Sequence, residues 1–163
     1  MLSDSLRPGG DITEVYQLYG SMLFKIAMVH LGNKQDVEEA LQETFIKLIH
    51  KSPPFTDREH QKAWLIRVVT NQCKNMQGSL WRRRVIRMED MDEYFEQPSD
   101  RSLMDHVLKL PFKYKAVIHL FYYEDYSVRQ IAGILQISES AVKMRLARGR
   151  QLLKMDLESE VES

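Results

Sequence analysis

The chain has 163 residues, of which 44% are hydrophobic and 28% carry a formal charge, so it suits one packed domain or two small ones. Its 23 basic and 23 acidic residues give a formal net charge of zero. It has no apolar run of about 18 residues, which excludes a membrane-spanning helix and predicts no direct membrane insertion. The single cysteine, Cys73, can form neither an intrachain disulfide nor a cysteine zinc site, and the amino end lacks a secretory pattern, so we expect a cytoplasmic protein.

Three amphipathic helices are predicted in residues 11–87, which we assign to a first domain that follows a flexible tail at residues 1–10. Asp11 begins the first helix as the N-cap of a capping box, and Gly32 ends it. The second helix begins near Asp36 and stops before two consecutive prolines, because proline has no amide hydrogen to donate.

The third helix is predicted to begin with a capping box of Thr56 and Glu59 and to run to about Gly78. It combines aromatic, amide and basic groups, and a cluster of arginines follows it. This combination suits the unstacked bases of single-stranded DNA, although a core tryptophan with a solvated basic end is the alternative. The residues concerned are Trp64, Arg67, Thr70, Asn71, Lys74, Arg82, Arg83 and Arg84.

The composition changes at residue 88. Residues 88–101 contain six acidic residues and one proline with little periodicity, so they are predicted to be an acidic linker. Residues 102–155 predict a second helical domain, with one helix near 102–108 and another at 112–122 before a helix-turn-helix. An acidic tail follows from residue 156 to residue 163. The predicted fold class is all-α: two small helical domains joined by an acidic linker.

The helix-turn-helix is predicted in residues 127–154 from two N-caps at suitable spacing. Ser127 and Gln130 form a capping box, Ala132 is small enough for a close helix crossing, and Ser138 caps the second helix. An ordinary helical hairpin with a cationic solvated face is the alternative. The caps and the wholly basic outer side favour DNA binding. The basic side chains left for the outside are Lys143, Arg145, Arg148, Arg150 and Lys154.

Four short motifs, taken in chain order, resemble those of one protein family. They are DVEEALQETF at residues 36–45, WLIRVVTN at 64–71, LPFKYKAV at 110–117 and AVKMRLARGR at 141–150. Each motif alone is weakly specific, but the ordered set is specific, and the match around it spans about residues 16–154. It resembles the bacterial RNA polymerase sigma factors of the extracytoplasmic-function type (group IV).

This resemblance implies a protein that is not an enzyme, needs no cofactor or metal, binds RNA polymerase core, and directs transcription initiation by recognising and melting promoter DNA. It also implies an anti-sigma factor as a further partner. In the first domain (sigma region 2), the implied contacts with polymerase core are Asp36, Glu39, Gln42 and Glu43. The implied contacts with the minus-ten element are Arg67, Asn71, Lys74, Arg82, Arg83 and Arg84. In the second domain (sigma region 4), the implied contacts with the minus-thirty-five element are Ser140, Lys143, Met144, Arg145, Ala147 and Arg148.

Three residues of the helix-turn-helix depart from the family pattern. Gln136 stands where a turn glycine is usual, and Met144, where serine is common, cannot donate a hydrogen bond. Gly149 lies inside the last helix, where glycine costs about 1 kcal/mol relative to alanine and is expected to loosen the helix end. We therefore expect an upstream promoter element that differs from the commonest one.

The main alternative function is a free-standing helix-turn-helix regulator that binds duplex DNA without polymerase core. That function would use the second domain but would leave the acidic helix and the residues suited to single strands without a role. An enzyme is disfavoured, because the five histidines lack metal-ligand spacing and the sequence has no phosphate-binding glycine loop or nucleophile elbow.

Overall fold

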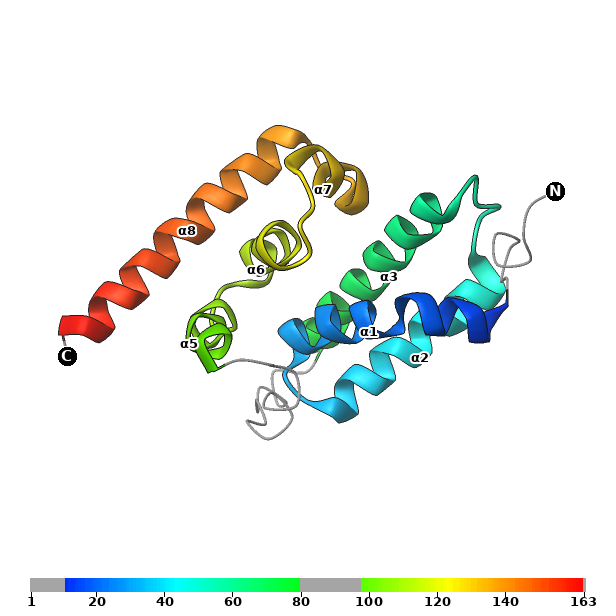
Figure 1. The fold of residues 1–163 in the computed structure, drawn as a ribbon, viewed down its shortest axis with the longest axis horizontal. Helices are drawn as coiled ribbons and strands as arrows, with labels where there is room; N and C mark the ends of the chain where they lie inside the picture. Colours follow the sequence, from blue (N-terminus) through cyan, green and yellow to red (C-terminus); the bar gives the residue numbers. More distant parts are fainter. Residues whose placement is uncertain (1–10, 80–97, 163) are drawn as a thin grey trace. The chain divides into compact units, whose positions relative to one another are not determined.

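Helices make up all the regular secondary structure of residues 11–79 and 98–162, the parts of the chain that the computed structural model describes (Figure 1). This confirms the predicted all-α class. The chain divides into two compact units, residues 1–90 and residues 91–163.

Several predicted features lie outside the described residues. The tail at residues 1–10 and the acidic linker up to residue 97 are among them. So are three of the basic residues expected at the minus-ten element, Arg82, Arg83 and Arg84. Their roles continue to rest on the sequence.

The first unit is built from three helices, α1 (Ile12–Leu31), α2 (Lys34–Lys51) and α3 (Arg58–Ser79). Each helix packs against the other two. Apolar residues recur every three or four positions along each helix, so one stripe of each faces the shared core, and burying each large aliphatic side chain stabilises the fold by about 1.5–3 kcal/mol. The buried aliphatic residues include Val15, Leu23, Ile26, Val37, Leu48, Leu65, Ile66 and Val69.

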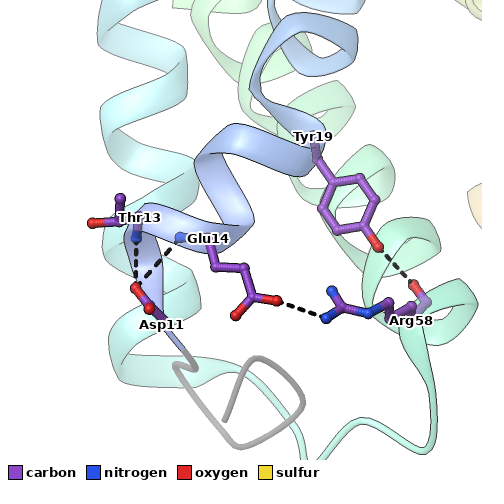
Figure 2. A network of polar contacts seen from close by, with 5 residues as sticks. All are labelled: Asp11, Thr13, Glu14, Tyr19 and Arg58. Carbon is purple, nitrogen blue, oxygen red and sulfur yellow. Dashed lines mark hydrogen bonds and ion pairs between the residues drawn. The ribbon is translucent and has the colours of Figure 1, made fainter. Parts of the chain in front are cut away.

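The start of α1 is fastened to the start of α3 by a small polar network (Figure 2). Asp11 caps α1 as predicted, because its Oδ1 accepts hydrogen bonds from the amides of Thr13 at 3.0 Å and Glu14 at 3.4 Å. The Glu14 carboxylate accepts from Arg58 Nη2 at 2.7 Å, and Tyr19 Oη donates to the Arg58 carbonyl oxygen at 3.5 Å. The Glu14 and Arg58 side chains remain substantially exposed, so this ion pair orients the two helices more than it stabilises them.

The connection from α1 to α2 differs from the sequence prediction. Gly32 ends α1 in the left-handed conformation (φ 77°), as predicted, but Asn33 rather than Asp36 begins the next helix. Asn33 Oδ1 accepts from the Asp36 amide at 2.9 Å, and Asn33 Nδ2 donates to Asp36 Oδ2 at 3.0 Å. This reciprocal pair leaves Asp36 only 4% exposed. Asp36 is therefore part of the cap of α2.

The start of α3 also differs, because Asp57 and not Thr56 accepts the capping hydrogen bond. Asp57 Oδ1 accepts from the His60 amide at 2.8 Å, while the Thr56 amide donates to His60 Nδ1 at 3.2 Å. The predicted capping box is wrong by one residue. Phe55, which is 1% exposed and packs edge-on against Trp64 with ring centroids 5.6 Å apart, anchors the preceding loop and fixes this register.

The second unit contains α5 (Pro98–Val107), α6 (Phe112–Ile118), η3 (His119–Tyr123), α7 (Val128–Leu135) and α8 (Glu139–Glu162). Helix α5 begins earlier than the predicted start near residue 102. Helix α8 continues through the acidic residues that were predicted to form a tail. Helix α8 packs against α5, α6 and α7. Buried apolar residues of these helices and of η3 form the core of this unit: Met104, Val107, Ile118, Leu120, Ile131, Val142 and Leu146.

The predicted helix at residues 112–122 ends in a wider turn, because η3 is a π-helix. The amide of Glu124 donates to the carbonyl oxygen of His119 at 3.2 Å, which lengthens the usual helical hydrogen-bond spacing by one residue. The His119 ring is buried and stacks on the Tyr123 ring, with centroids 5.7 Å apart. The apolar periodicity of residues 112–122 does not distinguish this turn from an α-helix.

Gly149 is needed for the close crossing of α8 and α6. This corrects the expectation that it loosens the end of the last helix. The residue is buried, and a Cβ atom at this position would lie 3.0 Å from Ile118 Cγ1 and 3.2 Å from its Cδ1. Ile118 is itself 1% exposed. The missing side chain therefore lets α8 approach α6 closely.

The acidic end of α8 contacts a buried histidine of α5. His106 Nδ1 lies 2.5 Å from Asp156 Oδ2, and His106 Nε2 lies 2.7 Å from Glu160 Oε2. The hydrogen bond to Asp156 raises the pKa of His106 above its ordinary value, against the opposing effect of burial, and the charge of Glu160 raises it further. The same hydrogen bond to His106 lowers the pKa of Asp156.

Candidate nucleic-acid interface

The helix-turn-helix is set by local hydrogen bonds that the sequence predicts. Ser127 Oγ accepts from the Gln130 amide at 3.1 Å, and Gln130 Oε1 accepts from the Ser127 amide at 2.9 Å, which completes the capping box of α7. Gln136 ends α7 in the left-handed conformation (φ 57°), at a cost of about 1–2 kcal/mol for a residue with a Cβ. Ser138 Oγ then accepts from the Ala141 amide at 3.0 Å and begins α8.

Helix α8 has a buried side and an exposed side over its first three turns. Successive residues are about 100° apart on a helix, so residues at positions i, i+3, i+4 and i+7 share one side. The side that faces the unit's core carries Val142, Leu146 and Gly149, all buried. The opposite side exposes five of the six residues predicted for the minus-thirty-five element: Ser140, Lys143, Met144, Ala147 and Arg148. We call these five residues the reading face.

Two other arginines of α8 flank the reading face. Arg145 is half-buried at the boundary with the core side. Arg150 Nε donates to Tyr122 Oη at 2.5 Å, and its guanidinium lies over the rings of Phe121 and Tyr122 at 5.8 and 5.5 Å. Cation–π contact holds Arg150 against η3. Arg148, by contrast, stays on the reading face, where its Nη1 donates to Gln151 Oε1 at 2.9 Å.

The residues predicted to contact polymerase core separate into two groups on α2. Glu39, Gln42 and Glu43 are exposed, whereas Asp36 is buried in the cap described above. The side that carries Glu39 and Gln42 also exposes Ile46 and Ile49, which are 48% and 50% exposed. Sequence reasoning missed these two isoleucines, although their spacing from Gln42 places them on the same side of a helix.

The residues of α3 predicted at the minus-ten element share one side of that helix. Asn71 and Lys74 are exposed and Arg67 is half-buried, at spacings that place them one turn apart. Trp64 is only 8% exposed, and it contributes to the core. The alternative stated for this tryptophan, a core residue, is therefore correct.

Two family comparisons match the two units. Residues 15–84 match Sigma-70 region 2, and residues 100–153 match Sigma-70, region 4. The first match covers α1 to α3, and the second covers the helix-turn-helix. This order defines an RNA polymerase sigma factor, a protein that directs promoter-specific initiation of transcription.

Similar proteins align with this chain over most of its length. The ECF RNA polymerase sigma factor SigW of Bacillus subtilis (strain 168) is 26% identical over 88% of this chain and 87% of its own length. SigL of Mycobacterium tuberculosis (strain ATCC 25618 / H37Rv), also an ECF sigma factor, is 28% identical, with the same coverage. The chain belongs to the extracytoplasmic-function (ECF) sigma factors.

Two solved structures share the fold. CnrH, determined in complex with the cytosolic domain of CnrY, aligns with a TM-score of 0.65 over 91% of this chain and 88% of its own, at 22% identity. The sigma factor RpoE of Bartonella quintana, determined with the anti-sigma factor NepR, aligns with a TM-score of 0.68 over 90% of this chain and 96% of its own, at 19% identity.

Within residues 11–79 and 98–162, no helix has the length and apolarity needed to cross a membrane. In the same ranges, no cluster of three or more histidine, cysteine, aspartate or glutamate side chains is placed to hold a metal ion.

Proposed function

We propose that the two units divide the work of promoter recognition. The first unit binds polymerase core through α2 and reads the minus-ten element through α3, and the second unit reads the minus-thirty-five element through α8. We also propose that the domains run from 11 to 87 and from 102 to 155, joined by the acidic linker. The observation that carries this proposal is the reading face of α8, which is exposed and lies opposite the buried side of the helix.

Reading of duplex DNA by α8 is supported by the size and charge of its exposed side. An α-helix fits the major groove, where base edges are accessible, and cationic side chains beside the helix can contact the phosphates. We assign base edges to Ser140, Met144, Ala147 and Arg148. We assign phosphates to Lys143 and Arg145.

Binding of polymerase core by α2 is supported by its mixed exposed side. Glu39, Gln42 and Glu43 suit a partner with basic and polar side chains, and Ile46 and Ile49 provide apolar surface that gains from burial in an interface. Water-exposed charges at the rim set the orientation of a complex, while buried apolar residues supply more of its affinity. We therefore place Ile46 and Ile49 at the centre of this contact.

Reading of the minus-ten element is supported by three residues on one side of α3. The Asn71 side chain can donate and accept hydrogen bonds at once, so it suits the edge of an unstacked base. Arg67 and Lys74 lie one turn away on either side and suit the flanking phosphates. On the sequence alone, we assign further phosphate contacts to Arg82, Arg83 and Arg84.

An anti-sigma factor is the third partner that we propose. The support is that both solved relatives, CnrH and RpoE, were determined with a bound regulator, the CnrY domain and NepR. We propose the cytoplasm as the site of action, since the template and the polymerase are there. In this scheme the chain supplies specificity, and the polymerase performs the chemistry.

DNA binding with and without polymerase core distinguishes this proposal from the free-standing regulator. The probe is a labelled promoter duplex selected from a random library by the chain with core polymerase, and anisotropy measures its binding. We expect the chain alone to bind the selected and a scrambled duplex weakly and equally, and the complex with core to prefer the selected duplex strongly. Tight, sequence-specific binding by the chain alone would support the regulator instead.

A further inference from the structure

The centre of the reading face is apolar, although its edges are cationic. Met144 is 67% exposed, and Ala147 lies one turn further along the same side. Lys143 lies at one edge of this side and Arg148 at the other. The cations are placed for phosphates or for a polar base edge, whereas the Met144 side chain offers apolar contact and no hydrogen-bond donor.

The exposure of Met144 differs from that of another apolar residue of α8, Leu157, which borders other apolar side chains of its own unit. Leu157, which is 38% exposed, lines a cavity of the second unit together with Leu103 and Val107. Met144 lies outside that cavity, on the side opposite the core. A large apolar side chain in this position gains free energy only when a partner removes it from water.

We infer that Met144 is a specificity-determining residue that contacts the 5-methyl group of a thymine in the minus-thirty-five element. Among the groups that base pairs present in the major groove, the thymine methyl is the apolar one. Methionine is unbranched and flexible, so its side chain can follow the position of that methyl group. This inference rests on the proposed function of α8 and adds the identity of one base.

The test removes single methyl groups from the DNA. A promoter is selected from a library randomised upstream, using the full chain with polymerase core, and each thymine of the selected upstream element is then replaced singly by deoxyuridine. Initiation rates are measured by run-off transcription at limiting complex. Because burying one methyl group contributes about fourfold to binding, we expect the wild-type chain to lose about fourfold at one thymine.

Three variants identify the residue that reads this methyl group. The Met144→Ala variant is expected to initiate transcription more slowly than the wild type on the thymine template. Its initiation rate should not fall further on the deoxyuridine template. Met144→Leu is expected to keep most of the methyl dependence. Met155→Ala is the matched control, since Met155 is a 56% exposed methionine beyond the reading face of the same helix, and it should behave like the wild type.

The outcomes separate this inference from the proposed function. An equal loss on deoxyuridine substitution for wild type and Met144→Ala would overturn the assignment of Met144, as would a wild-type chain that is insensitive to every substitution. Both results would leave promoter-dependent initiation intact. A chain that starts no transcript on any template with core would overturn the proposed function itself.

Discussion

Replacing Gly149 by alanine tests the close crossing of α6 and α8, which positions the reading face. Two opposing effects decide the result. Alanine favours a helix interior over glycine by about 1 kcal/mol. The added Cβ atom, however, would lie 3.0 Å from Ile118 Cγ1 and 3.5 Å from Tyr114 Cβ, and Ile118 is buried too completely to move aside freely.

Overpacking of this kind destabilises a protein by about 1–3 kcal/mol, so we expect Gly149→Ala to be destabilising by a net of about 0–2 kcal/mol. Gly133 in α7 provides the matched control, because a Cβ atom there would have no heavy atom within 4 Å apart from its chain neighbours and the backbone of its own helix. Gly133→Ala is therefore expected to stabilise the second unit by about 1 kcal/mol.

Urea unfolding followed by far-UV circular dichroism measures both variants. Both tryptophans, Trp64 and Trp81, belong to the first unit, so tryptophan fluorescence follows that unit separately and should not change. If Gly149→Ala stabilises the second unit as much as Gly133→Ala does, the close crossing deduced from the structure is refuted.

Three further predictions concern charged residues. Glu43→Lys is expected to abolish co-purification with polymerase core while the circular dichroism spectrum is unchanged; Glu59→Lys, an equal charge reversal on α3, should co-purify normally. Arg148→Ala is expected to lose about 1–3 kcal/mol of binding at one base pair of the upstream element, and uniform weakening on every promoter would show phosphate contact only. Since the pKa of His106 is raised in the fold, its contribution to stability is complete below about pH 6.5 and is lost as the pH rises through the raised pKa. As the pH rises, the amides near Asp156 should therefore exchange hydrogen faster than the pH dependence of intrinsic exchange accounts for. His106→Gln should remove this additional acceleration. The same acceleration in the variant would contradict the role given to His106.

The features that the sequence predicted correctly depend on near neighbours in the chain. The capping box of Ser127 and Gln130, the left-handed Gly32 and the cap at Ser138 each involve residues within a few positions, so local chemistry determines them. The exposed side of α8 follows from helical periodicity in the same way.

The features that were missed depend on contacts between distant parts of the chain. Gly149 was interpreted as a weak point because its neighbour across the crossing, Ile118, belongs to another helix. The register at Asp57 was missed because it is fixed by the burial of Phe55, which depends on packing against α3. Asp36 is an exception, because its burial comes from a local contact: it was predicted to contact polymerase core, and the sequence does not distinguish its reciprocal bond to Asn33 from other local pairings.

Run-off transcription with polymerase core on a promoter library tests the central claim most directly. If the chain binds a promoter through two units while it is bound to polymerase, adding it to core should produce transcripts with defined start sites from a subset of templates. Core alone should not produce these transcripts. The absence of any chain-dependent transcript across the whole library would contradict the account.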